Sequence, residues 1–258
     1  MERTKFAFGT KEWAPYNFNF MNGCSNDCVY CYAKEMAIRF KRKTYDDWKN
    51  EEHVDLACRS YGKKNGPIMV PSSHDITPGN IETAVVVMGK LLKSGNELLL
   101  VTKPRLACIK RITKEFCRYK TQIRFRFTIG SASDGVLRLW EPGAPSFEER
   151  LEALRTTFKE GFSTSISCEP LLDDRFDLLY EKVAPFVTDV IWVGKMNMAE
   201  KRVRANTNGS FPEEAVTSLI ADQSDERIIA LFNKYKEDPK IRWKESIQKV
   251  AAAHGLLY

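Results

Sequence analysis

Long apolar runs are missing from this sequence. None approaches the roughly 18 uncharged residues that a membrane-spanning helix needs, and no apolar signal region follows the charged start at residues 1–5. The chain has only 14 Gly and 11 Pro in 258 residues, which excludes collagen-like and low-complexity proteins. Hydrophobic residues make up 43% and charged residues 29%, as in a globular protein with a buried core. We therefore expect a soluble, cytoplasmic protein with no membrane partner.

Histidine is also scarce, and the cysteines are unevenly placed. The seven cysteines are an odd number, and three of them fall within residues 24–31, which argues against a disulfide framework. The only histidines, His53, His74 and His254, are isolated from one another, and no second pair of closely spaced cysteines occurs. Zinc sites usually take their ligands as two separated pairs, so zinc is the weaker interpretation of the three cysteines.

Short β-rich runs alternate with segments of helical periodicity along most of the chain. The six predicted strands are 17–21, 67–70, 98–102, 123–129, 163–168 and 189–193. The predicted helices are 31–41, 79–93, 105–119, 146–161 and 176–183. This alternation favours parallel strands joined by right-handed crossovers in a curved or partly closed α/β barrel. We expect the barrel over residues 1–210 and a helical extension over 211–258 packed on it.

Cys24, Cys28 and Cys31 follow the first predicted strand in the stretch GCSNDCVYCYA. The surrounding Gly, Asn, Asp and Ser are typical of a loop, in which the three sulfurs can converge, and not of a core. A 4Fe-4S cluster held by three cysteines leaves one iron free for substrate or cofactor chemistry. Ordinary buried thiols and a zinc site remain the alternatives.

The spacing CxxxCxxC, with Tyr30 and Tyr32 on either side of the last cysteine, resembles the signature of the radical S-adenosylmethionine (SAM) superfamily. The resemblance implies a partial (β/α)6 TIM-type barrel, a 4Fe-4S cluster on the three cysteines, and SAM chelated to the fourth iron. It also implies cleavage of SAM to a 5′-deoxyadenosyl radical that abstracts hydrogen from a substrate. Reduced flavodoxin or ferredoxin is the electron donor that it implies.

Three further stretches resemble the spore photoproduct lyase branch: VTKPR at 101–105, FTIGSASD at 127–134 and EPGAPSFEERLEAL at 141–154. By this resemblance Tyr30 packs near the adenine, Lys103 pairs with the SAM carboxylate and Thr128 faces the ribose. The glycine-rich GGE-type motif of many superfamily members is absent, and PSSHD stands at 71–75, where groups near Ser72 and Ser73 would hold the SAM amino group. The hydrogen-donor cysteine of the photoproduct lyases is also absent there, which argues against thymine-dimer repair by that route.

Two residues at the end of the fifth predicted strand are further candidates. Cys168 is either a thiol hydrogen donor at the barrel mouth or a small buried side chain. Glu169 would bind ribose hydroxyls or a substrate amine, or carry a solvated charge. After the second strand, His74 and Asp75 are either acid and base groups or part of a loop in which Asp75 caps the next helix.

Basic residues gather in two segments. Residues 103–126 hold nine Lys or Arg against a single acid, and residues 195–204 add four more. Such a surface can neutralise nucleic-acid phosphates, although Arg124 and Arg126 would equally pair with internal carboxylates. A nucleic-acid base or nucleotide is the substrate class that the resemblance and the charge together favour. The alternative function is a nucleic-acid-binding protein with a structural iron–sulfur or zinc site and no radical chemistry; an electron carrier is the third.

Overall fold

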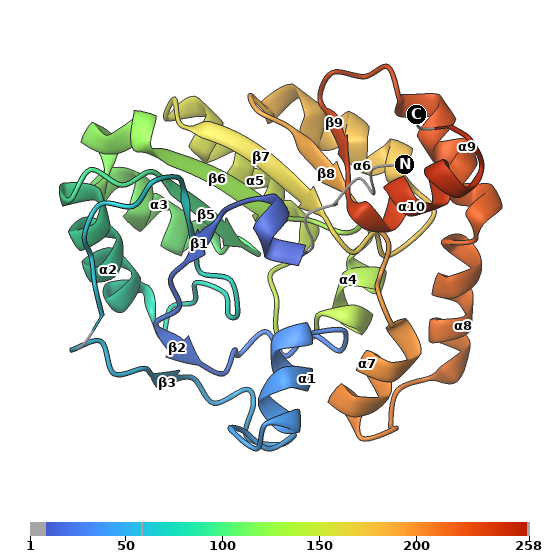
Figure 1. Cartoon of the computed structure of the whole chain (residues 1–258), viewed down its shortest axis with the longest axis horizontal. Coiled ribbons are helices and arrows are strands. Elements are labelled where there is room, and N and C mark those ends of the chain that lie inside the picture. The colour runs from blue at the N-terminus through green and yellow to red at the C-terminus, as the bar shows by residue number, and fades with distance from the viewer. Residues whose placement is uncertain (1–8, 58, 257–258) are drawn as a thin grey trace, which may run out of the picture.

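A seven-stranded parallel sheet forms the centre of the protein, seen here in a computed structural model that describes residues 9–57 and 59–256 (Figure 1). The strands lie in the order β1-β4-β5-β6-β7-β8-β9, and each neighbouring pair is parallel. Their bounds are β1 Tyr16–Asn17, β4 Ile68–Val70, β5 Leu98–Thr102, β6 Ile123–Thr128, β7 Ser163–Cys168, β8 Ile191–Val193 and β9 Ile241–Trp243. The predicted α/β alternation with parallel strands is confirmed.

Helices connect the strands from β4 to β8; α2 and α3 lie at the left of Figure 1, and α5 and α6 lie behind β6 to β8. Their bounds are α2 Ile81–Lys93, α3 Leu106–Glu115, α5 Phe147–Lys159 and α6 Phe176–Val183. The sequence explains α5 well: the Ser146 hydroxyl accepts from the Glu149 amide at 3.2 Å, an N-terminal cap. Gly161, just past the end of this helix, has a φ of +77°, which glycine adopts at little cost.

Alternation along β6 and β7 gives this part of the sheet one apolar face and one polar face. On β6 and β7, Phe125, Phe127 and Ile166 pack into the main hydrophobic core between the sheet and its helices. The intervening residues Arg126 and Ser165 point to the other face and bond to each other at 3.0 Å. Since successive side chains of a strand face opposite ways, polar residues of the central strands gather on the concave side of the sheet.

The predicted strand 17–21 is two strands in the structure. Its first part is β1, and its second part is β2 (Met21–Asn22), which pairs antiparallel with β3 (Glu52–His53). The amides of Phe20 and Met21 both donate to Nε2 of His74 at 3.2 Å. A side chain has thus taken the place of a neighbouring strand, and the chain turns away from the sheet.

The C-terminal part is mainly helical, as expected, but it also supplies a strand that the sequence analysis missed. Its elements are α8 Glu213–Asp222, α9 Asp225–Tyr235 and α10 Glu245–Ala253, with β9 between the last two. The strand β9 extends the sheet beside β8, so residues on both sides of position 210 build one sheet. The division into 1–210 and 211–258 stays a prediction.

Three short helices complete the part that positions the site: α1 Tyr32–Arg39, α4 Asp134–Trp140 and α7 Ala199–Thr207. Helices α1 and α7 lie side by side below the sheet in Figure 1 and contact each other. Neither α4 nor α7 was predicted: α4 has only seven residues, and α7, AEKRVRANT, is mostly polar and shows little apolar periodicity. Within the described ranges, no helix is long and apolar enough to cross a membrane.

Candidate active site

A cavity of about 500 Å³ opens where the strands β5 to β7 end. Its wall combines the loop that carries the three clustered cysteines, residues 23–31, with strand ends and the start of α7; we call residues 23–31 the thiol loop. A volume of this size is typical of small-molecule sites. Of the ten residues expected to hold the cluster, bind SAM or substrate, or donate hydrogen, nine line it: Cys24, Cys28, Tyr30, Cys31, Ser72, Ser73, Lys103, Thr128 and Glu169. The acid and base candidates His74 and Asp75 line it as well.

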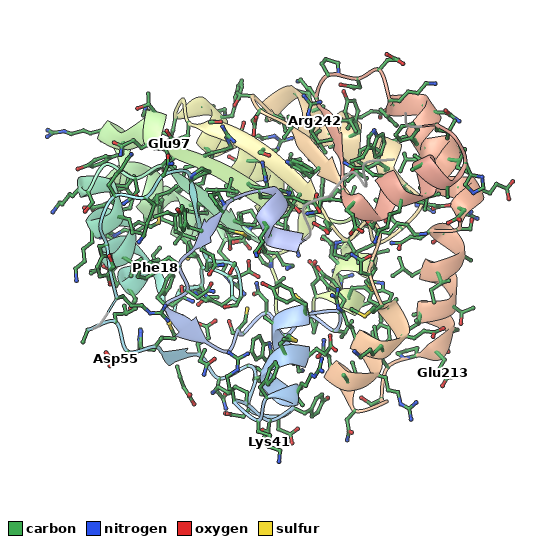
Figure 2. All side chains as sticks on the ribbon, viewed as in Figure 1. Phe18, Lys41, Asp55, Glu97, Glu213 and Arg242 are labelled. Carbon is green, nitrogen blue, oxygen red and sulfur yellow. The ribbon has the colours of Figure 1, made fainter. Side chains whose placement is uncertain are left out.

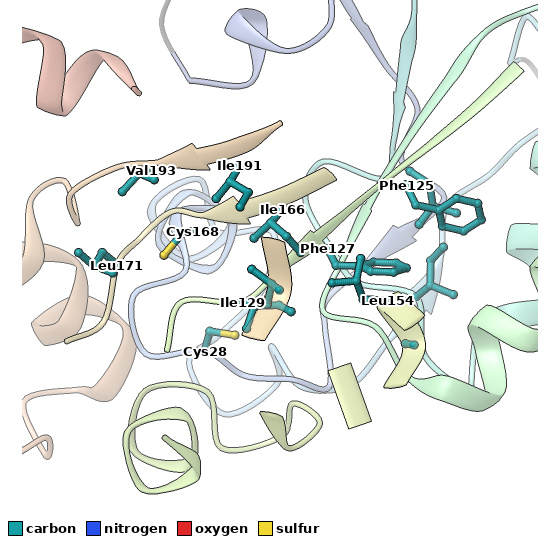
Figure 3. Close-up of a cluster of buried hydrophobic side chains, with 14 of the residues drawn as sticks. Cys28, Phe125, Phe127, Ile129, Leu154, Ile166, Cys168, Leu171, Ile191 and Val193 are labelled. Carbon is teal, nitrogen blue, oxygen red and sulfur yellow. The ribbon is translucent and has the colours of Figure 1, made fainter. Parts of the chain in front are cut away.

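Cys168 is the exception. Its side chain is fully buried in the hydrophobic core, among Ile166, Leu171 and Val193, and it does not line the cavity (Figure 3). The residues on either side of it, Ser167 and Glu169, do line the cavity. The expectation of a hydrogen-donor thiol here is therefore not met, because strand alternation turns Cys168 to the helix-covered face.

The thiol loop is held by groups from distant parts of the chain. The Cys24 amide donates to the Trp48 carbonyl at 3.0 Å, and the Val29 amide donates to the Trp140 carbonyl at 3.0 Å. Asn206 on α7 is buried, and its Nδ2 donates to the carbonyls of Val29 at 3.1 Å and Cys31 at 2.8 Å. These bonds fix the backbone on which the three sulfurs are mounted.

Residues 141–143, which follow α4, press closely on the same loop. The Gly143 amide donates to the Asn26 carbonyl at 3.0 Å, and Arg105 donates to the Asn26 side chain at 3.1 Å. A β-carbon on Gly143 would lie 2.2 Å from the Ser25 carbonyl oxygen. Only glycine fits here, so this position is shaped by the thiol loop itself.

Glu141 is the centre of a buried charged network. It forms an ion pair with Arg150 at 2.5 Å, and the side chains of both residues are fully buried. The Tyr30 hydroxyl donates to its Oε1, and the Lys103 ammonium lies 3.9 Å from the same oxygen. The segment EPGAPSFEERLEAL thus connects α5 with the thiol loop through Glu141, which bonds to Arg150 on α5 and to Tyr30 on the loop.

Lys103 and Asp75 face each other across the cavity wall at 3.7 Å. Burial alone would raise the pKa of Asp75, but Lys103 and hydrogen bonds from the Lys103 amide, Asn26 and Thr102 lower it below its usual value. Asp75 therefore stays ionised. It does not cap α2, whose N-cap is Asn80, so that expectation was wrong. Lys103, on the cavity wall, lies between the carboxylates of Asp75 and Glu141.

Burial raises the pKa of all three clustered thiols. The positive charge of Lys103 acts in the opposite direction on Cys28 and Cys31. Without a metal these groups are therefore protonated, and metal binding releases their protons. Among residues 9–57 and 59–256, no three Cys, His, Asp or Glu side chains are arranged as the ligands of a single metal ion.

The stretch PSSHD holds its own loop in place. The amides of Ser72 and Ser73 donate to Oδ1 of Asn19 at 2.7 and 3.1 Å, and the Ser72 carbonyl accepts from the Tyr32 hydroxyl. Burial lowers the pKa of His74, whose Nε2 accepts from the two β2-side amides described above. His74 is thus neutral and has a structural role.

Ser167 is a cavity residue that the sequence analysis missed. It is 1% exposed, lines the cavity and pairs in register with Thr128 on the neighbouring strand. Its hydroxyl has no hydrogen-bond partner within the part of the chain that the structure describes. An unpaired buried hydroxyl costs free energy, which a ligand with a polar group would recover. The alternation of Ser163, Ser165 and Ser167 in the strand was the signal that could have identified it.

Part of the predicted basic surface is paired with carboxylates of the protein. Arg124 and Arg126 both pair with Asp189, at 3.3 and 3.6 Å, as the internal alternative predicted. In the second segment, Lys201 and Arg202 pair with Glu35, and Lys195 pairs with Asp225. Fewer positive charges are therefore free to bind nucleic-acid phosphates in these two segments than the number of Lys and Arg residues indicated.

Comparison with known proteins assigns the family. The sequence profile of the Radical SAM superfamily matches residues 18–172, more than half of the chain. The chain belongs to the radical SAM superfamily. It is therefore an enzyme of a superfamily that uses SAM and an iron–sulfur cluster. Two buried thiols and a partly buried third, Cys31, lie beside an unpaired hydroxyl in a cavity of small-molecule size. These features fit SAM and an iron–sulfur cluster.

Two curated relatives share part of the sequence with this radical SAM protein. An uncharacterised protein from Methanocaldococcus jannaschii is 28% identical over 208 residues, 78% of each chain. An uncharacterised protein from Acidianus two-tailed virus is 25% identical over 175 residues, 62% of this chain and 56% of the viral one.

Solved structures of spore photoproduct lyase share the fold. A variant with bound S-adenosylmethionine and dinucleoside spore photoproduct has a TM-score of 0.58, and one with the dinucleoside alone has 0.56. Both are 16% identical to this radical SAM protein and cover 93% of it and 79% of the lyase chain. The likeness confirms the partial TIM-type fold.

Proposed function

We propose that this protein is a radical SAM enzyme in which Cys24, Cys28 and Cys31 hold a 4Fe-4S cluster whose fourth iron binds SAM. The observation that carries the proposal is that the three clustered thiols, Lys103 and Thr128 line one cavity of about 500 Å³. When bound, the reduced cluster supplies the electron that cleaves SAM to a 5′-deoxyadenosyl radical, which takes hydrogen from the substrate.

The residues around the cavity have distinct tasks in this proposal. Lys103 supplies a positive charge for the SAM carboxylate, and its ion pair with Asp75 keeps it pointed along the cavity wall. Thr128 and Ser167, paired on β6 and β7, present two hydroxyls for the ribose. Tyr30 is fixed by Glu141 and lies within 5.6 Å of the Lys103 ammonium, where its ring closes the space beside the adenine.

A nucleic-acid base or nucleotide is the substrate class that we propose. The support is the shared fold with spore photoproduct lyase, whose solved complexes contain a dinucleoside, and the presence of Glu169 and Lys195 on the cavity wall. The carboxylate of Glu169 pairs with Lys244 at 3.2 Å and is held at the end of β7. A reduced flavodoxin or ferredoxin is the proposed electron donor.

The decisive experiment uses anaerobically purified, iron-reconstituted protein. We expect its EPR signal after dithionite reduction to shift when SAM is added, and 5′-deoxyadenosine to accumulate. A fully loaded cluster with neither a shift nor a nucleoside product would overturn the proposal in favour of a nucleic-acid-binding protein with a structural cluster. About one mole of zinc per mole of protein, in place of iron, after native purification would favour a structural zinc site.

The Ser167→Ala variant tests the unpaired hydroxyl. We expect its Kd for SAM to rise about threefold to tenfold, because one hydrogen bond contributes roughly 0.5–1.5 kcal/mol. Isothermal titration of SAM into the reconstituted protein measures this. Ser163→Ala is the matched control: it lies on the same strand but does not line the cavity. Equal affinities for wild type and Ser167→Ala would exclude Ser167 from the SAM site.

A further inference from the structure

An exposed aromatic ring surrounded by positive charge stands at the end of α1. Phe40 is 58% exposed, and the guanidinium carbons of Arg39 and Arg42 lie 5.8 and 5.9 Å from its ring centroid. Lys41, also exposed, is labelled at the lower edge of the molecule in Figure 2, at the far end of α1 from the sheet. We call Arg39, Phe40, Lys41 and Arg42 the α1-end patch.

The charges of this patch are unpaired, whereas nearby lysines are paired. Lys34 forms an ion pair with Asp27 at 2.6 Å, and Lys43 pairs with Asp47 and Glu52. Within residues 9–57 and 59–256, Arg39, Lys41 and Arg42 have no carboxylate within ion-pair distance. Three unpaired like charges around an exposed ring repel one another, and the carboxylates of a partner would relieve this repulsion.

The patch lies close to the clustered thiols. Cys31 is the N-cap of α1, and the eight residues of the helix span about 12 Å. The Arg42 amide donates to the Ala37 carbonyl at 2.9 Å. Ala37 in turn packs with Cys24, Ala33 and Trp48 in one small hydrophobic cluster, against which Cys31 also packs. A continuous, tightly packed path thus connects the patch with two of the thiols.

The patch is also separate from the cavity, since none of its residues lines the cavity wall. A substrate must enter the cavity to react. An electron, by contrast, can cross packed protein over the length of α1, about 12 Å. These observations favour a redox partner over a nucleic-acid substrate at this surface.

We propose that the α1-end patch is the docking surface for an acidic protein that carries a one-electron donor. The inference rests on the proposed function, because it requires a cluster on the three thiols. The partner loses one electron, the cluster gains it, and no bond forms or breaks. Carboxylates of the partner would meet Arg39, Lys41 and Arg42, and an apolar contact would cover Phe40.

The test compares two triple variants of the reconstituted protein that each remove three positive charges. In the first, Arg39, Lys41 and Arg42 are replaced by Gln; in the control, Lys110, Lys114 and Arg118, exposed on α3 and the turn after it, are replaced by Gln. The probe is purified flavodoxin, an acidic flavin protein, with binding followed by isothermal titration at low and high salt. Phe40→Ala is a second variant that leaves the charge unchanged.

We expect the patch triple variant to bind flavodoxin about tenfold more weakly than wild type, with a reduced salt dependence. Phe40→Ala should bind severalfold more weakly, and the α3 control should match wild type. Flavodoxin-driven formation of 5′-deoxyadenosine should fall in parallel, whereas the rate with dithionite, a small reductant that needs no docking, should be unchanged.

Equal flavodoxin affinity for the patch triple variant and wild type would overturn the proposal. The proposal would also be overturned if the patch triple variant lost binding of a single-stranded oligonucleotide but still bound flavodoxin. That result would make the patch a nucleic-acid surface. Failure of the proposed function has a different signature: wild type then forms no 5′-deoxyadenosine even with dithionite, while the titration still reports whether flavodoxin docks on the patch.

Discussion

Cys28→Ala should lose its iron–sulfur cluster and, with it, all cleavage of SAM. Cys28 is 5% exposed and lines the cavity with the other two thiols, and among the described residues no further thiol lines that cavity to replace it. Because Fe–S clusters are held by Cys thiolates, two thiols at this loop hold the cluster poorly. We expect iron content near that of a blank after reconstitution and 5′-deoxyadenosine at background level.

The matched control is Cys108→Ala. Cys108 is equally buried, at 3% exposed, but it lies on α3 and outside the cavity. This variant should bind iron and cleave SAM like wild type, apart from a modest loss of stability. A Cys28→Ala protein that retains full iron content and wild-type cleavage would remove Cys28 from the cluster.

Glu141→Ala should lower the free energy of unfolding by about 3 kcal/mol or more. Removal of one partner from a buried ion pair leaves an uncompensated charge, which costs roughly 3–5 kcal/mol. Arg150 keeps bonds to the carbonyls of Pro145 at 2.9 Å and Thr128 at 3.2 Å, so we expect the lower part of that range. Urea unfolding of the metal-free protein, followed by circular dichroism, measures the change.

Glu148→Ala provides the comparison for Glu141. Glu148 also pairs with an arginine, Arg155 at 3.0 Å, but its side chain is 70% exposed. Exposed pairs contribute about 0–1 kcal/mol, so this variant should unfold almost like wild type. If both variants lost less than about 1 kcal/mol, the buried network would not stabilise the fold as its geometry implies.

Elements with a clear apolar run or period between breaks were predictable, because burial and capping act locally. β5 and β7 occupy the predicted residues, and α6 does so too, since each is a short apolar or periodic run between clear breaks. β9 was missed because three residues between two helices carry no period that sequence reasoning can detect. The sequence analysis predicted β1 and β2 as one strand. The chain turns between them because the amides of Phe20 and Met21 donate to His74, which lies 53 and 54 positions away in sequence.

The site was predictable where spacing alone defines it. Three cysteines within eight residues must lie together, and the structure places them around one cavity. The position of Cys168 depended on strand register, since a shift of one residue moves a side chain to the other face of the sheet. Asn206 carried no local signal, because its contacts with the thiol loop come from a polar helix 175 and 177 positions away in sequence.

Those long sequence separations bear on the biosynthesis of the protein. The thiol loop is translated early, but Trp140, Gly143 and Asn206, which hold it, leave the ribosome much later. Until Asn206 has emerged, the carbonyls of Val29 and Cys31 lack their partner and the loop is not fixed. The three sulfurs therefore acquire their final arrangement only when about four fifths of the chain has been made. If the three thiols hold the proposed cluster, iron and sulfide can be bound there only late in synthesis, and a chain truncated before α7 would lack a formed site.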